Sequence, residues 1–312
     1  MTSRPEPGPD RPDPSLSVLV GERRQLIDIA YRLLGSLAEA EDAVQEACAR
    51  WYAMSRQQRE AVESPGAWLT TVASRICLDV LGSARARRER YVGEWIPEPL
   101  PDGAQWLHGR PGAGGDPADL VTLDESVDMA FLVVLESMTP AERVAFVLHD
   151  VFQYPFADVA AIVGRTPAAC RQLASSGRRR IRAARPPVAP RVRDEGEARI
   201  IREFKQAWEA KDIAALVGLL DPDATMTADG GGLAGAALRP VTGAERIARY
   251  IVGIGDLAPG MELLERSVNG RPGLAARRGG VTVTVAAFGL AGERIAQIWA
   301  VRNPEKLGRW GG

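Results

Sequence analysis

The sequence predicts a multidomain protein in which two all-helical units precede an α+β domain. Its 312 residues exceed the usual size of one domain, and 46% of them are hydrophobic, which is enough for several cores. Apolar residues recur at helical spacing as far as Pro186, whereas alternation of apolar and polar residues begins only near Val281. Helices that come before a late group of strands are typical of an α+β arrangement.

The first helical unit is expected at residues 16–92, behind a disordered tail at residues 1–15. Three of its segments have helical spacing and a recognisable start or end. Gly35 ends the first segment, Ser36-Leu37-Ala38-Glu39 opens the second as a capping box, and Ser64-Pro65 opens the third. The second helix is acidic and the third ends in arginines, so the unit has one acidic and one basic surface.

A linker and a second helical unit follow. Residues 93–116 are dense in proline and glycine, and the second unit is expected at residues 117–187. Thr139-Pro140-Ala141-Glu142 is a capping box with proline at the first helical position, and Thr166-Pro167 repeats this start after Gly164. Two helices that meet near a glycine in this way indicate a helix-turn-helix.

An arginine stripe follows the second of these helix starts. Between Asp158 and Asp194 there are nine arginines and no acidic residue. The net charge of the whole chain is only -1, so the stripe is a local asymmetry and the acids lie elsewhere. An unbalanced run of arginines on a helix predicts contact with the phosphates of a nucleic acid.

The last domain is expected at residues 195–312, after a second linker at residues 188–194. Its first part has helical spacing, and Thr242-Gly243-Ala244-Glu245 is a further capping box. Residues 281–286 alternate between valine and smaller or polar residues, and residues 294–301 form another apolar run. These two runs are predicted to be antiparallel strands.

Six segments along the chain, taken together, form a recognisable series. Three of them are residues 40–46 and 68–73 and the block 139–181. The other three are short motifs: Trp95-Ile96-Pro97-Glu98-Pro99, Asp229-Gly230-Gly231-Gly232 and Asn303-Pro304-Glu305-Lys306-Leu307. In this order they resemble the extracytoplasmic-function (ECF) sigma factors of RNA polymerase that carry a C-terminal SnoaL-like extension. The resemblance implies two all-α sigma domains, a region 2 helical bundle and a region 4 helix-turn-helix. It also implies a cone-shaped α+β domain similar to nuclear transport factor 2.

The resemblance also implies two partners, core RNA polymerase and promoter DNA, and the residues that meet them. The acidic second helix is expected to bind a basic surface of core polymerase, although an acidic helix face is also typical of a surface that only meets water. The residues implied for core polymerase are Asp42, Gln45 and Glu46. Those implied for the -10 element, where the DNA strands separate, are Arg75, Arg85, Arg87 and Arg88. Those implied for the -35 element are Thr166, Arg171, Gln172, Ser175, Ser176, Arg178 and Arg179.

Several positions depart from the pattern of similar sigma factors. Val80 and Gly82 stand where relatives commonly carry arginine, and Gln153 stands where they often have a turn glycine. Ser175-Ser176-Gly177 replaces a stretch that usually reads Ser-Arg-Ala. Glycine inside a helix lowers helix stability by about 0.5–1 kcal/mol relative to alanine, so Gly177 is expected to loosen the recognition helix.

The linker motif is expected to dock on the extension. Trp95, Pro97, Glu98 and Pro99 form a stiff amphipathic peptide that suits a groove. We expect it to lie against Asp229 to Gly232 and against Asn303 to Leu307, and so to fix the spacing of the two DNA-binding units.

Two functions are consistent with the sequence. The first is a sigma factor regulated in cis by its extension, and the alternative is a helix-turn-helix regulator whose C-terminal pocket binds or converts a small ligand. The extension contains no histidine, since His108 and His149 lie elsewhere, so we expect no enzyme activity, metal or cofactor. A small ligand in the C-terminal pocket stays open. Without an apolar run long enough to cross a membrane, the chain is expected in the cytoplasm.

Overall fold

The computed structural model describes residues 14–88, 91–101, 127–184, 194–257 and 259–311. The tail expected at residues 1–15 lies outside this part up to residue 13, and helix α1 (Pro14–Leu34) already begins at Pro14. Most of the linker at residues 93–116, the first part of the second unit up to residue 126 and nearly all of the linker at residues 188–194 are also outside the described residues.

The first helical unit packs α1, α2 (Leu37–Ala53) and α4 (Pro65–Arg88) around one apolar core, with a short α3 (Arg56–Glu60) before α4. The predicted boundaries are confirmed: Gly35 has φ +68° and donates its N–H to the Tyr31 carbonyl at 2.7 Å. Ser64 Oγ accepts the Ala67 N–H at 3.3 Å, which caps the start of α4. The helix α3 was not predicted, although its capping box is present in the sequence.

The second helical unit contains α5 (Met129–Glu136), α6 (Pro140–Phe146), a π-helical turn η2 (Val147–Val151), α7 (Phe156–Val163) and α8 (Pro167–Ala184). The capping box at Thr139 is confirmed in both directions: Glu142 N donates to Thr139 Oγ1 at 3.3 Å and Thr139 N to Glu142 Oε2 at 2.9 Å. Gly164, with φ +69°, separates α7 from α8. Gln153 has φ +61°, the left-handed conformation that explains a glycine at this turn in relatives.

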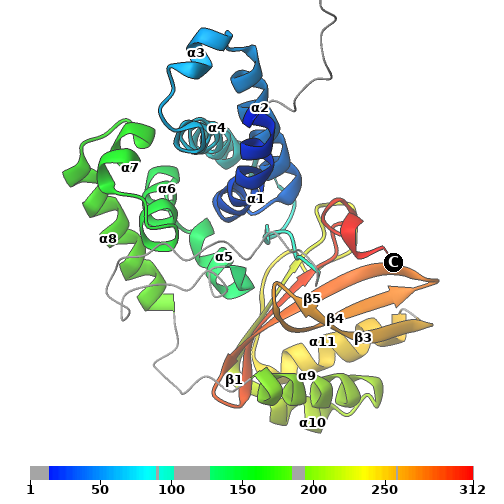
Figure 1. Ribbon diagram of the computed structural model, residues 1–312. Coiled ribbons are helices and arrows are strands. Elements are labelled where there is room, and N and C mark those ends of the chain that lie inside the picture. Colours follow the sequence, from blue (N-terminus) through cyan, green and yellow to red (C-terminus); the bar gives the residue numbers. More distant parts are fainter. Residues whose placement is uncertain (1–13, 89–90, 102–126, 185–193, 258, 312) are drawn as a thin grey trace, which may run out of the picture.

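The two helical units pack directly against each other. Figure 1 shows α4 beside α7, and one apolar core includes residues of both units. Polar contacts between the two units accompany this core. The hydroxyls of Thr70 and Tyr154 are 3.2 Å apart, Arg75 Nη2 donates to the Ala161 carbonyl at 2.7 Å, and Arg143 Nη1 donates to the Leu33 carbonyl at 2.9 Å.

In residues 194–257 and 259–311, three α-helices combine with a six-stranded sheet, which agrees with the predicted α+β class. The helices are α9 (Asp194–Glu209), α10 (Ile213–Leu219) and α11 (Ala244–Leu257). The strands are β1 (Leu220–Asp229), β2 (Val241–Thr242), β3 (Met261–Val268), β4 (Arg271–Arg278), β5 (Val281–Ala291) and β6 (Arg294–Val301). Their order is β2-β1-β6-β5-β4-β3, with β1 and β6 parallel and all other pairs antiparallel. The predicted antiparallel strands at 281–286 and 294–301 are confirmed as β5 and β6.

One predicted helix start in this domain is wrong by one residue. The helix α11 begins at Ala244, so Gly243 and not Thr242 precedes its first turn, and the Ile247 N–H bonds to the Gly243 carbonyl at 3.0 Å. Thr242 is instead the end of β2, where it pairs with Thr225. Because β2 continues almost to the helix, Thr242 pairs within the sheet, and Gly243 is the residue before the first helical turn.

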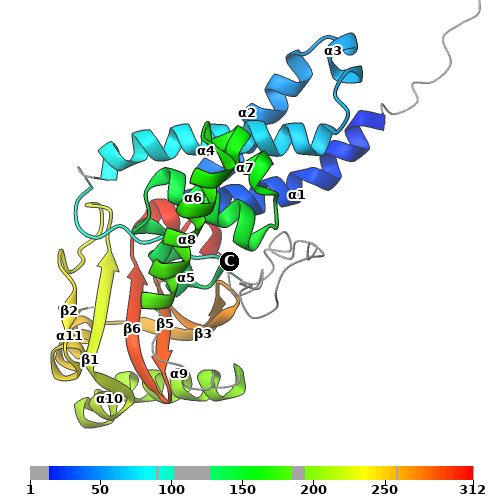
Figure 2. The same cartoon turned by 90° about the vertical axis from the view of Figure 1, so that its left-hand side faces the viewer.

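The two faces of the sheet are covered by different parts of the chain. Helices α9, α10 and α11 cover one face and form an apolar core with it (Figures 1 and 2). The other face forms a second core with side chains from the linker, from α5 and from the C-terminal turn, among them Ile96, Met129 and Trp310. The sheet is therefore the platform on which the linker and the second helical unit rest.

Candidate nucleic-acid interface

Helix α8 presents part of the expected recognition surface to solvent. Thr166 Oγ1 accepts the Ala169 N–H at 3.2 Å and so caps the helix. Arg171, Gln172 and Arg179 are exposed. The guanidinium of Arg171 lies 5.7 Å from the centroid of the Phe156 ring, which places it beside the start of α7. These exposed donors can reach the edge of a DNA groove.

The rest of the expected recognition set is partly covered by the protein. Ser175 and Ser176 are half-buried, whereas contact with the -35 element would need them to be exposed. Ser176 Oγ donates to Glu142 Oε1 at 2.7 Å, and Arg178 Nη1 pairs with Asp150 Oδ1 at 2.6 Å. Burial alone would raise the pKa of Glu142, but the hydrogen bonds from Ser176 and Thr139 outweigh it and lower the pKa overall. Ser176 and Arg178 thus hold α8 on its neighbours.

Gly177 has a packing role that the sequence did not predict. It is buried where α8 crosses α6, and a Cβ atom at this position would lie 2.9 Å from the Phe146 Cβ. The expectation that Gly177 loosens the helix overlooked this contact, because the missing side chain is what lets the two helices approach. Gly82 in α4 is different, since a Cβ there would meet nothing within 4 Å.

The arginines expected at the -10 element fall into two groups. Arg75 is exposed on α4 and donates to the Ala161 carbonyl of α7, so it is engaged between the two helical units. Arg85, Arg87 and Arg88 belong to the last turns of α4, and their side chains lie outside the described part of the structure. Of these four arginines, Arg75 is the one whose contacts the described part of the structure includes.

The residues expected to meet core polymerase are exposed on α2. Asp42, Gln45 and Glu46 all lie on its surface, and Glu46 Oε1 pairs with Arg50 Nε at 2.9 Å. Their neighbour Glu41 pairs with Arg309 from the C-terminal turn. The acidic face is therefore open to solvent, with a cation of the last domain at its edge.

The structure brings the three short motifs together around Asp229, which is fully buried at the end of β1. Asp229 Oδ2 accepts the Ile96 N–H at 3.0 Å and pairs with Lys306 Nζ at 2.7 Å. Lys306 Nζ also donates to the Ile96 carbonyl at 2.5 Å and lies 4.0 Å from the centroid of a ring of Trp95. Each polar group of this buried pair thus has a partner in the linker.

Neighbouring residues of the motifs complete this junction. Asn303 caps the 3-10 helix η3 (Pro304–Lys306) by accepting the Glu305 N–H, and its Nδ2 lies 2.5 Å from where a Gly231 Cβ would be. A side chain at Gly231 would therefore collide with the other motif, which explains a glycine there. Leu307 is buried in the core on the linker side of the sheet, whereas Pro304 and Glu305 are exposed.

A second set of contacts, which the sequence did not predict, holds the other end of the linker motif. Glu98 Oε2 accepts the Leu37 N–H at 2.7 Å, and the Glu98 carbonyl accepts the Tyr31 hydroxyl at 2.7 Å. Burial raises the pKa of Glu98. Asn269, at the tip of the β3–β4 hairpin, donates to the Tyr31 hydroxyl at 2.9 Å and accepts the Leu100 N–H at 3.0 Å. Asn269-Gly270 signals a hairpin turn in the sequence, but not that its side chain enters another domain.

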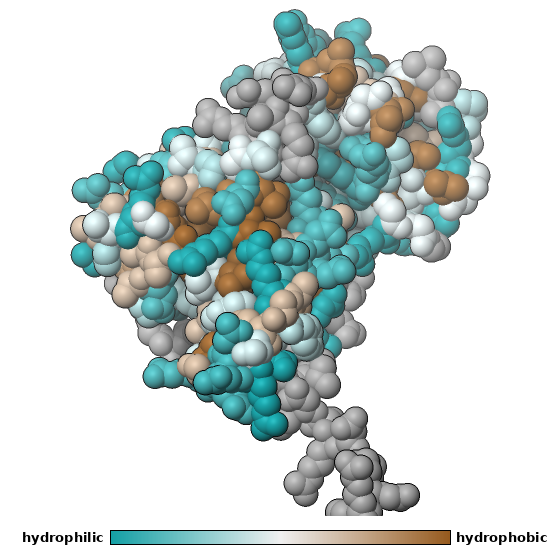
Figure 3. Space-filling view, turned by 90° about the horizontal axis from the view of Figure 1, so that it is seen from above, coloured by the Kyte–Doolittle hydropathy of each residue, from teal (hydrophilic) through white to brown (hydrophobic). Residues whose placement is uncertain are grey.

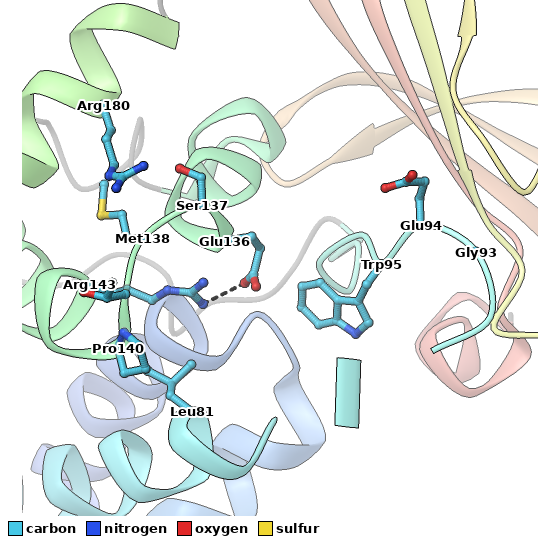
Figure 4. Close-up of a pocket in the computed structure, with 11 residues that line it drawn as sticks. Leu81, Gly93, Glu94, Trp95, Glu136, Ser137, Met138, Pro140, Arg143 and Arg180 are labelled. Carbon is cyan, nitrogen blue, oxygen red and sulfur yellow. Dashed lines mark hydrogen bonds and ion pairs between the residues drawn. The ribbon is translucent and has the colours of Figure 1, made fainter. Parts of the chain in front are cut away.

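A cleft of about 620 Å³ lies where the linker meets the first and second helical units. Figure 4 shows Trp95 on one side of it and the ion pair between Arg143 and Glu136 on the other, at 2.7 Å. Leu81 of α4 and Arg180 of α8 also line it. The cleft therefore lies beside the place where the linker meets both helical units.

Hydrophobic side chains gather in a patch on the face of the helical units seen from above (Figure 3).

Among the residues that the structure describes, no group of three or more His, Cys, Asp or Glu side chains could hold a metal ion, and no helix is long and apolar enough to cross a membrane.

Two family matches coincide with the helical units. Residues 19–88 match the family described as Sigma-70 region 2, and residues 128–181 match Sigma-70, region 4. The chain is 37% identical over 296 residues to the ECF RNA polymerase sigma factor SigJ of Mycobacterium tuberculosis strain H37Rv, covering 91% of this chain and 90% of that one. It is 34% identical over 296 residues to the probable ECF RNA polymerase sigma factor SigI of strain CDC 1551, covering 95% of each chain.

A solved structure is similar over nearly the whole length. The crystal structure of M. tuberculosis SigJ aligns with a TM-score of 0.71 and 32% identity, covering 94% of this chain and 98% of that one. The alignment includes the last domain, which has the SnoaL-like architecture expected from the sequence. The chain therefore belongs to the ECF sigma factors, the subunits that direct RNA polymerase to promoters.

Proposed function

We propose that the SnoaL-like extension regulates promoter recognition in cis by holding the linker between the two sigma units. The buried contacts of Asp229 and Lys306 with Ile96 carry this proposal, because they tie the linker to the extension immediately after α4. At the other end of the motif, Glu98 contacts the start of α2. Because α5 of the second unit packs on the same sheet, a linker motif held at Ile96 and Glu98 limits how far the two units can separate.

We assign promoter contacts to the exposed residues of α8 and to the basic end of α4. Arg171, Gln172 and Arg179 are the candidates for the -35 element, with Thr166 at the helix start. Arg85, Arg87 and Arg88 are the candidates for the -10 element, together with Arg75 once it leaves Ala161. Asp42, Gln45 and Glu46 are the candidates for core polymerase, and we propose that the protein acts with that enzyme in the cytoplasm.

We assign no catalytic role to the extension. Its helix-side interior is filled by apolar side chains such as Phe204, Phe288 and Ile298, and its sequence contains no histidine. Proton transfer near neutral pH requires a suitable acid or base at the reacting atoms, and this interior offers apolar side chains instead. The buried contacts of the sheet with the linker favour a regulatory domain over a ligand-converting one.

Run-off transcription with purified core polymerase tests the proposal. The full chain is compared with a truncation after Pro190 and with Trp95→Ala, which removes the ring beside Lys306 and Gly35. Both changes free the linker, so we expect more initiation per bound polymerase at equal protein level. Equal output from all three proteins would contradict regulation in cis, and no core-dependent initiation from any of them would contradict the assigned promoter role.

A further inference from the structure

The C-terminal turn of the extension reaches the acidic helix of the first sigma unit. In the 3-10 helix η4 (Gly308–Trp310), Arg309 Nη2 lies 2.8 Å from Glu41 Oε1 of α2. Glu41 precedes Asp42 directly and Gln45 by one helical turn, so it lies at the edge of the same acidic face. A cation of the extension therefore touches the surface assigned to core polymerase.

The backbone that carries Arg309 is firmly anchored by Trp310. The indole is buried, its Nε1 donates to the Pro99 carbonyl at 2.9 Å, and Thr282 Oγ1 donates to the Trp310 carbonyl at 2.8 Å. Trp310 also belongs to the apolar core between the sheet and the linker. Arg309 is thus presented to Glu41 from a fixed position, and the pair forms without the ordering of a free tail.

The charges of α2 define the partner that this face fits. Glu41, Asp42 and Glu46 are acidic and at least partly exposed, and complementary basic side chains on a partner speed association and fix its orientation. Arg309 neutralises one of these acids. It also places a positive charge where a basic side chain of the partner would approach.

We propose that Arg309 competes with core polymerase for the acidic face of α2, so that docking of polymerase displaces the C-terminal turn from Glu41. This inference rests on the proposed function, in which α2 meets core polymerase. The side chains of both partners are partly exposed, at 47% for Arg309 and 38% for Glu41, so the competition is modest and weakens with salt.

The affinity of the full chain for purified core polymerase tests the competition. We expect Arg309→Ala to bind about two- to fivefold more tightly than the unchanged protein at low salt, with a smaller gain at high salt. Arg249→Ala is the matched control, because it removes the same charge from an exposed position of α11 on the far side of the sheet. In a Glu41→Gln background, Arg309→Ala should change the affinity no further.

Three outcomes would overturn the competition. They are an unchanged or weaker affinity of Arg309→Ala, an equal gain in Arg249→Ala, and a full gain in the Glu41→Gln background. Failure of the unchanged protein itself to bind core polymerase would instead overturn the proposed function. The two ideas therefore fail in different ways.

Discussion

Gly177 and Ser176 are adjacent in α8, and each has a role set by its contact with α6. Gly177 provides the space in which Phe146 lies against α8, and Ser176 donates to Glu142, whose carboxylate also caps the backbone of Thr139. A large or charged side chain at either position would separate the recognition helix from its support. Both departures from the usual pattern, Ser176 and Gly177, therefore depend on how α8 packs against α6.

Replacing Gly177 by alanine is expected to destabilise the protein by about 1–3 kcal/mol, since the new methyl group would overpack against Phe146. The matched change Gly82→Ala adds a methyl group into open space in α4 and should stabilise it by about 0.5–1 kcal/mol. Urea unfolding of the two variants measures both values. A stabilising Gly177→Ala would contradict the packing role.

Replacing Ser176 by alanine is expected to reduce stability by about 1.5–3 kcal/mol, because it removes a hydrogen bond to a charged carboxylate. The pKa of Glu142 lies below its ordinary value of 4.5, so its charge stabilises the fold above pH 4.5, and this stabilisation is lost as the pH falls through the lowered pKa. The variant should lose less stability over that acidic range. Unfolding measured from pH 7 to pH 3 tests this, and unchanged pH dependence would contradict it.

At the scale of elements, the linker motif connects the first sigma unit to the sheet. Ile96 fills the apolar core beneath it, while Asp229, Lys306 and Asn269 satisfy its backbone polar groups. An extended peptide can be buried only when its N–H and C=O groups find such partners. The position of the linker motif thus depends on residues of both the linker and the extension.

Lys306→Met is expected to destabilise the junction by about 3–5 kcal/mol, because it leaves the buried Asp229 carboxylate without its cation. The double variant Asp229→Asn with Lys306→Met removes both charges and should recover part of this loss. Protease cleavage near residues 93–101 measures how far the linker motif is released from the sheet. Equal cleavage of the single variant and the unchanged protein would contradict the role of the pair.

The sequence predicted the elements that have local signals and missed those that depend on distant partners. The starts at Ser64, Thr139 and Thr166 were predictable because a cap bonds within three residues. Strand β1 was missed because its parallel partner β6 lies about seventy residues further on, and Asp221 and Asp223 interrupt the alternation. The contacts of Asn269 with Tyr31 and of Arg309 with Glu41 join residues more than 200 positions apart, and no local pattern encodes them.

At the scale of the whole molecule, the two sigma units form one closed body. They share an apolar core, and Arg143 and Arg75 donate across their boundary. The -35 and -10 elements are separated by about 25 base pairs, on the order of 80 Å along DNA. Units in direct contact cannot span this distance, so reading both elements requires them to separate.

This separation can be measured by energy transfer between dyes at Gln57 and Ala183, which are exposed on different units. We expect high transfer in the free protein, because the units are packed together, and low transfer after core polymerase and promoter DNA are added. Dyes at Gln57 and Ala49, both within the first unit, provide the control. Constant transfer for the first pair would contradict the opening.

The contact between Lys306 and Ile96 also has a consequence for how the protein is made. The two residues are 210 positions apart, so Ile96 leaves the ribosome long before its partner exists. At about 5–20 residues per second, the delay is on the order of 10–40 s. By the end of that interval both sigma units have been synthesised, but Lys306 cannot contact Ile96 until translation has passed β6, so the nascent chain lacks the regulatory contact that we propose for the extension.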